Sequence, residues 1–129
     1  MDERIRYINI RMIGLFSLTE KDAWHVISTE IRRLVGAAGA ADIGLFLAFF
    51  DPKSQGGIFR VAHRYIHRVR GALCFIQKWN QNPIFTYSEN VSGTLKTAKK
   101  ELLSAGHLHR ASVLTKIFHN YWKSSFDDD

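Results

Sequence analysis

An antiparallel sheet of four strands with helices packed on it is the architecture that this sequence predicts, and three observations predict it. Residues 6–13 alternate between apolar and polar side chains, which is typical of a strand with one buried face. Capping signals and apolar residues spaced three and four apart follow, and they favour a helix to about residue 35. Two further strands, a second helix and a fourth strand complete the order β-α-β-β-α-β, which is the α+β, ferredoxin-like split arrangement.

The first strand is expected to be half-buried. Ile8 and Ile10 point to one side, whereas Asn9 and Arg11 point to the other. Ser17 with Glu20 and, one register later, Thr19 with Asp22 both have the spacing of a capping box at the start of the first helix. Glycines at 36 and 39 are expected to end that helix.

The second strand, over residues 43–50, is apolar on both faces, so we expect both faces to be covered. Strict alternation assigns Leu45, Leu47 and Phe49 to one face, and Phe46, Ala48 and Phe50 to the other. A helix of the same domain would cover one face. The C-terminal helix or a partner protein would cover the second.

After a turn over 51–57 the chain returns as a strand over 58–62, and a helix over 64–80 follows. Cys74 lies in the apolar pattern of that helix and is expected to be buried. A fourth strand at 84–87 leads to a third helix ending near residue 105, and residues 108–122 predict a fourth. We expect one domain over 1–126, with its core at about 6–103 and an acidic tail at 127–129.

The charge distribution indicates a polyanionic partner. The net charge is +6, and the 37 residues from 52 to 88 contain six Lys or Arg and no Asp or Glu. Carboxylates are too sparse for paired-carboxylate catalysis, and neither a P-loop nor a GxGxxG motif is present. His63 and His67 have a metal-site spacing without further ligands nearby, so we expect no metal site and no catalytic residues.

The Ser92-Gly93-Thr94 turn precedes a helix that carries lysines three and four residues apart. Either Ser92 or Thr94 can cap the helix, and the glycine allows a ligand to approach the backbone. The first turn of a helix attracts phosphate. The strand over 57–61 lacks the aromatic pattern of the common RNA-recognition motif, which favours contacts to phosphates over stacking of bases on the sheet.

At this point the sequence resembles a known family, that of ribonuclease P protein component 2, which is shared by archaeal ribonuclease P and eukaryotic ribonuclease P/MRP. The resemblance covers about residues 6–103. It is carried by the segments Arg6-Tyr7-Ile8, Gly57-Ile58-Phe59-Arg60-Val61, Val69-Arg70-Gly71-Ala72-Leu73 and Val91-Ser92-Gly93-Thr94-Leu95-Lys96.

The resemblance implies a non-catalytic RNA-binding subunit of archaeal type that supports a catalytic RNA in removing the 5′ leader of precursor tRNA. The protein itself binds no cofactor, and magnesium is expected at the active site of the RNA. The implied partners are ribonuclease P RNA, ribonuclease P protein component 3 and other ribonuclease P proteins, with possible self-association in a heterotetramer.

Two sets of candidate residues follow from this hypothesis. We expect phosphate contacts from Arg60, Arg64, Arg68, Arg70, Ser92, Gly93, Thr94, Lys96, Lys99 and Lys100. We expect a protein interface at Phe46 and Phe50.

Three other functions fit the same predicted fold. They are a stand-alone RNA chaperone, a small-ligand regulatory domain and an acylphosphatase-like enzyme. The last would need an arginine in a phosphate loop after the first strand, and residues 14–19 contain none. The chain has no apolar run of transmembrane length and no signal-peptide core at its first residues, so we expect a soluble, cytoplasmic protein without membrane contact.

Overall fold

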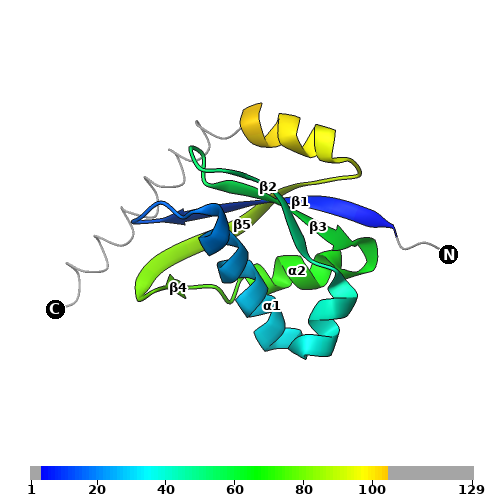
Figure 1. The fold of residues 1–129 in the computed structure, drawn as a ribbon, viewed down its shortest axis with the longest axis horizontal. Coiled ribbons are helices and arrows are strands. Elements are labelled where there is room, and N and C mark those ends of the chain that lie inside the picture. The colour runs from blue at the N-terminus through cyan, green and yellow to red at the C-terminus, as the bar shows by residue number, and fades with distance from the viewer. Residues whose placement is uncertain (1–3, 105–129) are drawn as a thin grey trace.

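The computed structural model describes residues 4–104 (Figure 1). Its elements are β1 (Ile5–Gly14), α1 (Glu20–Ile43), β2 (Phe46–Asp51), β3 (Gly56–Ala62), the short 3-10 helix η1 (His63–Tyr65), α2 (Ile66–Leu73), β4 (Lys78–Trp79), β5 (Asn82–Ser92) and a helix over 95–104. The expected order of strands and helices is confirmed. The predicted helix 108–122 and the tail 127–129 lie outside the described residues.

The strands form one antiparallel sheet in the order β2-β3-β1-β5-β4. β3 and β1 lie in the middle, as the ferredoxin-like arrangement requires, and the short β4 extends the sheet beyond β5. The short strand β4 was not predicted. It forms because Asn80 and Gln81 adopt positive φ angles of 50° and 69°, which gives a tight turn and lets Lys78–Trp79 pair with the start of β5.

Helices cover both faces of the sheet. In Figure 1, α1 and α2 lie below the sheet and the yellow-to-orange helix 95–104 lies above it. The main core, between the sheet and α1 and α2, contains Ile8, Ile10 and Phe59. A smaller cluster joins Ile58 of β3 to Ala98 and Leu102 of helix 95–104. The second face of the sheet is therefore buried by the chain's own helix over part of its area.

The first helix begins as predicted and ends later. Thr19 and Asp22 form the capping box, because each side chain accepts a hydrogen bond from the backbone N–H of the other. The prediction that the helix ends near residue 36 is wrong. Gly36 instead kinks it, with φ 77° and ψ 173°, and the helix resumes as far as Ile43, where Gly44 closes it in the left-handed conformation.

A β-bulge in β2 overturns the predicted assignment of its side chains to faces. Phe46 pairs with Arg60, but the register shifts between Leu47 and Phe49, so that Phe49 pairs with Ile58. A bulge adds one residue to a strand and reverses the alternation beyond it. Phe46 and Phe49 therefore lie on the face that carries helix 95–104, and Phe50 packs in the main core on the other face.

The second helix is much shorter than predicted. It ends at Leu73, because the N–H groups of the next three residues bond to carbonyls three positions back and tighten the chain into a turn. Cys74 follows the last helical residue and is exposed, which corrects the expectation of a buried thiol. The last strand is longer than predicted and extends to Ser92, alongside β1.

Within residues 4–104, no helix is long and apolar enough to cross a membrane. The same residues contain no group of three or more His, Cys, Asp or Glu side chains that could hold a metal ion.

Candidate nucleic-acid interface

The start of helix 95–104 is capped by Thr94. Its Oγ1 accepts the backbone N–H of Thr97 at 3.3 Å, and its carbonyl accepts the N–H of Ala98 at 3.2 Å. Ser92, the other predicted cap, is only 7% exposed and donates its hydroxyl to Glu101 Oε2 at 3.2 Å. Gly93 is exposed, and a Cβ there would meet nothing within 4 Å. Of this turn, Gly93 and Thr94 face outward and Ser92 faces inward.

The three lysines of this helix differ in their surroundings. Lys96 and Lys100 are exposed. Lys99 is half-buried, with its Nζ 4.9 Å from the ring centroid of Phe49 on β2. This is the geometry of a cation–π contact, which fixes Lys99 over the edge of the sheet.

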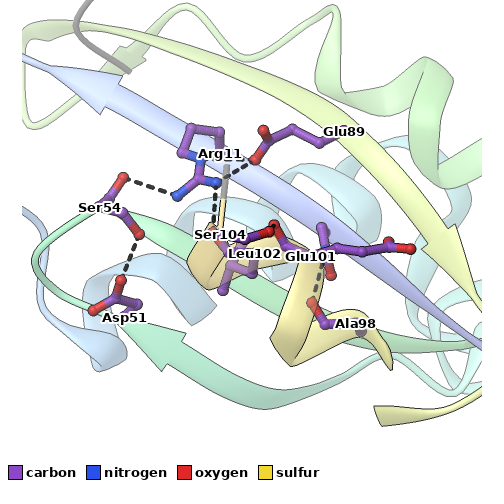
Figure 2. Close-up of polar contacts among 9 residues, drawn as sticks. Arg11, Asp51, Ser54, Glu89, Ala98, Glu101, Leu102 and Ser104 are labelled. Carbon is purple, nitrogen blue, oxygen red and sulfur yellow. Dashed lines mark hydrogen bonds and ion pairs between the residues drawn. The ribbon is translucent and has the colours of Figure 1, made fainter. Parts of the chain in front are cut away.

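Helix 95–104 is attached to the sheet by two buried polar side chains of β1, Arg11 and Asn9. Figure 2 shows Arg11 between Glu89, Ser54 and Leu102. Arg11 is completely buried and donates from Nη2 to the carbonyl of Leu102 at 3.3 Å and from Nη1 to the carbonyl of Ser54 at 3.2 Å. Asn9, also completely buried, donates from Nδ2 to the carbonyl of Ala98 at 3.0 Å. The polar face of β1 is thus a docking site for the helix, and the predicted half-buried strand is buried on both sides.

The buried charge of Arg11 is compensated by Glu89 on β5. Arg11 Nε lies 2.7 Å and Nη2 2.6 Å from Glu89 Oε1. A buried guanidinium is tolerated only when it is paired and its donors are used. The turn before β3 is shaped for this: Ser54 Oγ donates to Asp51 Oδ2, and a Cβ on Gly56 would lie 2.5 Å from Arg11 Nη1.

The predicted arginines lie in two places. Arg60 is exposed on β3, on the same face as helix 95–104. Arg64 and Arg68 are exposed on η1 and α2, with their Cζ atoms 4.9 and 5.6 Å from the ring centroid of Tyr65. Arg70 is exposed farther along α2 and donates from Nε to Ser88 Oγ at 3.1 Å.

These two places meet at one end of the sheet. Tyr7 pairs with both Arg60 and Ser92, so β3 and β5 end beside the start of β1. η1 leaves from β3 there, and helix 95–104 begins there after β5 (Figure 1). We call this end, with its exposed cations, the basic end of the molecule. Its members are Arg60, Arg64, Arg68 and Lys96, and Arg70, Lys99 and Lys100 extend it along the two helices.

The two predicted interface residues do not share a surface. Phe46 is 58% exposed, whereas Phe50 is 8% exposed and belongs to the main core. Two apolar hollows run along the outer side of α1 and the edge strand β2, with volumes of about 580 and 330 Å³, and Phe46 borders the first of them. Trp24 lines both hollows. Phe46 and Leu47 line the first together with Glu20 and Lys21, and Ile31 and Leu45 line the second. We call these two hollows the α1–β2 groove.

Known proteins share both the sequence pattern and the fold. The chain is 28% identical to "Ribonuclease P protein component 2" of Pyrococcus horikoshii over 102 residues, which are 79% of this chain and 85% of that protein. It is 29% identical to the protein of the same name from Pyrococcus abyssi over 102 residues, 79% of this chain and 86% of that one. The corresponding protein of Methanococcus aeolicus is 26% identical over 105 residues, 81% of this chain and 76% of its own.

A chain in the cryo-EM structure of yeast ribonuclease MRP has the same fold, with a TM-score of 0.59 at 13% identity, covering 97% of this chain and 96% of that chain. Residues 6–103 match the Rpp14/Pop5 family. The match spans the sheet, the helices on both faces and the basic end. The chain therefore belongs to the Rpp14/Pop5 family.

Proposed function

We propose that this protein is a non-catalytic, RNA-binding subunit of ribonuclease P, which supports the catalytic RNA in removing the 5′ leader of precursor tRNA. The observation that carries the proposal is the basic end, where cations from both helical layers converge on one end of the sheet. Relatives named ribonuclease P protein component 2 support the choice of this RNA over others.

The mechanism is electrostatic. Folding an RNA active site brings phosphates close together, and their repulsion opposes the active shape. Arg and Lys side chains that contact these phosphates release counterions and stabilise the compact RNA. The magnesium ions required for cleavage would be bound by the RNA, and the protein would lower the magnesium concentration at which the RNA folds.

The rigid placement of the cations matters to this mechanism. Helix 95–104 is fixed by buried hydrogen bonds from Asn9 and Arg11, so the backbone positions of its lysines are fixed relative to Arg60. Preorganised cations lose less conformational entropy on binding than cations on a mobile segment.

The proposal includes protein partners. Ribonuclease P protein component 3 would bind at the α1–β2 groove, where Trp24 and Leu47 present apolar surface beside an edge strand. The complete particle would contain the RNA and other ribonuclease P proteins, with self-association into a heterotetramer, and would act in the cytoplasm.

A cleavage assay tests the proposal. Ribonuclease P RNA from the same source is incubated with precursor tRNA at limiting magnesium, with this protein, with component 3, or with both. We expect faster 5′ cleavage only when both proteins are present, and little gain at high magnesium, where the ion replaces the protein.

Two outcomes would contradict the proposal. Tight, salt-dependent RNA binding without any stimulation of cleavage would indicate a stand-alone RNA chaperone instead. Absence of RNA binding would contradict every function that acts on RNA.

A further inference from the structure

Phe46 is a large apolar side chain that borders the first hollow of the α1–β2 groove and has a cation on the neighbouring strand. It lies on the edge strand β2 and is 58% exposed. Its cross-strand partner is Arg60 of β3, and the next partner in the same row is Tyr7 of β1. Three adjacent strands thus present an aromatic ring, an exposed guanidinium and a second aromatic ring in a row on one face.

The β-bulge extends this arrangement along β2. Because the register shifts after Leu47, Phe49 lies on the same face as Phe46. Lys99 of helix 95–104 stands over the ring of Phe49, with its Nζ 4.9 Å from the centroid. Phe46 therefore has Arg60 beside it and a lysine over the next aromatic ring. Glu20 and Lys21 line the hollow that Phe46 borders, and their charges cancel, so the net charge around Phe46 is positive.

This combination matches the chemistry of an unpaired nucleotide. A nucleobase has an apolar face that stacks on aromatic rings, and each base brings a phosphate that a nearby Arg or Lys can neutralise. A protein partner at the same place would have to supply carboxylates for the cations as well as apolar surface for the ring. The charge of the neighbourhood favours RNA.

We propose that Phe46 stacks against an unpaired base of the bound RNA while Arg60 contacts the phosphate next to it. The inference rests on the proposed RNA-binding function and deepens it, since it specifies that the RNA presents a single-stranded nucleotide at the β2 edge. Stacking at an edge strand differs from stacking on the middle of the sheet, which helix 95–104 covers in part.

The test compares two RNA probes with the full chain. One is a 12-nucleotide oligouridylate and the other is an RNA duplex of 12 base pairs, each titrated at several salt concentrations. We expect Phe46→Ala to raise the Kd for the single strand about 10-fold, to change the Kd for the duplex less than about twofold, and to leave the salt slope for both unchanged. Phe46→Trp is expected to restore single-strand binding, because it keeps the stacking surface.

Phe85→Ala is the matched control. Phe85 is an exposed strand aromatic, 46% accessible, but it pairs with Ile13 at the opposite end of the sheet. We expect this variant to bind both probes like the wild type. The thermal unfolding midpoint of each variant shows whether the fold is retained.

Several results would overturn the inference. Equal Kd values for wild type and Phe46→Ala would remove the stacking role while leaving the RNA-binding function intact. An equal loss on both probes, or no recovery with Trp, would indicate a non-stacking effect. If Phe46→Ala still binds RNA but no longer responds to component 3 in the cleavage assay, Phe46 belongs to a protein interface. A wild type that binds neither probe would overturn the proposed function as well.

Discussion

Arg11 is the residue on which the second face of the sheet depends. Its guanidinium is inaccessible to solvent and joins four segments of the chain: β1, the turn at Ser54, β5 through Glu89, and helix 95–104 through Leu102. Glycine at position 56 leaves the space that the guanidinium needs, since a Cβ there would lie 2.5 Å from Arg11 Nη1. Loss of Arg11 would leave two carbonyls without their donors and a carboxylate without its charge partner.

We expect Arg11→Met to lower the free energy of unfolding by about 3–5 kcal/mol, because Glu89, whose side chain is only 10% exposed, then keeps a largely buried and unpaired charge. Urea unfolding followed by circular dichroism measures this. The double variant Arg11→Met with Glu89→Met should recover part of the loss, since it removes both charges. A double variant with the summed loss of the two single variants would contradict a coupled pair.

The hydroxyl of the partly buried Tyr87 is expected to lower the stability of the protein at alkaline pH. Burial raises the pKa of Tyr87 above its ordinary value of 10.0, and the nearby Glu89 carboxylate raises it further, against an opposing effect of Arg11. At a pH between the pKa of Tyr87 in the unfolded chain and its higher pKa in the folded chain, the hydroxyl has lost its proton in the unfolded chain and keeps it in the folded chain. The free energy of unfolding therefore falls as the pH rises through this range.

Tyr87→Phe should therefore lose less stability than the wild type between about pH 9 and 11. Urea unfolding at steps of half a pH unit measures the difference, and the tyrosinate absorbance of the folded protein follows the titration directly. Parallel stability curves for the two proteins would show that this hydroxyl titrates alike in both states.

At the residue scale, the sequence predicted what depends on local signals. The cap at Thr94, the exposed Lys96 and the capping box at Thr19 need only their neighbours in the chain, and each is found as expected. The burial of Arg11 could not be predicted in this way. It depends on a helix 91 residues away whose carbonyl meets the guanidinium, and an arginine on an alternating strand is ordinarily a solvent-exposed residue.

At the scale of elements, α1 shows how one backbone position shapes a surface. Gly36 has φ 77° and ψ 173°, a conformation that is essentially restricted to glycine. The kink separates the helix into two segments, and the second hollow of the α1–β2 groove is lined by residues from both, including Ile31 and Ala40. The shape of this proposed partner surface therefore depends on a glycine that is not itself among the residues lining the hollow.

We expect Gly36→Ala to lower the free energy of unfolding by about 1–3 kcal/mol, because alanine is strained at this φ although no atom lies within 4 Å of its Cβ. Gly71→Ala is the matched control. Gly71 also has open space around its Cβ but lies in α2 with ordinary helical geometry, so the same substitution should stabilise the protein by about 0.4–1 kcal/mol. Effects of the same sign in thermal or urea unfolding would contradict the assignment of strain to Gly36.

Helices and strands could be predicted where the apolar residues recur with a clear period. Local irregularities, such as a bulge or an early helix end, could not be predicted from that period. A strand over 43–50 was predicted, and the observed strand runs over Phe46–Asp51 because α1 extends to Ile43. Its bulge was not predicted, because five consecutive apolar residues contain no signal that distinguishes the two faces. The end of α2 was missed for a related reason. Apolar residues at 75 and 76 continue the helical period although the chain has already turned.

At the scale of the whole molecule, the basic end and one group of exposed apolar side chains lie at opposite ends of β1. The basic end lies where β1 begins, whereas the exposed Leu15, Phe16 and Phe85 lie at or just beyond its other end. The strand order that produces this arrangement was predictable from the order of elements along the chain. Its consequence, that arginines of α2 and lysines of helix 95–104 flank the same end from opposite faces, required the register of β1 with both neighbours.

The paired variant Lys96→Ala with Lys100→Ala tests the basic end. We expect weaker binding to ribonuclease P RNA and a shallower dependence of log K on log salt, with the slope reduced by about 0.7–0.9 for each phosphate contact that is lost. Filter binding between about 50 and 200 mM salt measures it. Lys78→Ala, an exposed lysine on β4 outside the basic end, serves as the control and should leave the slope unchanged. An unchanged slope in the paired variant would remove helix 95–104 from the RNA contacts.

The hydrogen bonds from Asn9 and Arg11 to helix 95–104 end on main-chain carbonyls, those of Ala98 and Leu102. Every amino acid offers the same carbonyl, so the polar part of this attachment does not depend on which side chains the helix carries. The outward positions of the helix are free to change in evolution or by design without loss of these bonds. The hydrogen bonds from the sheet would therefore hold helices of different surface sequence in the same position. The cations on the outward side of the helix can change to suit a different RNA while the fold stays the same.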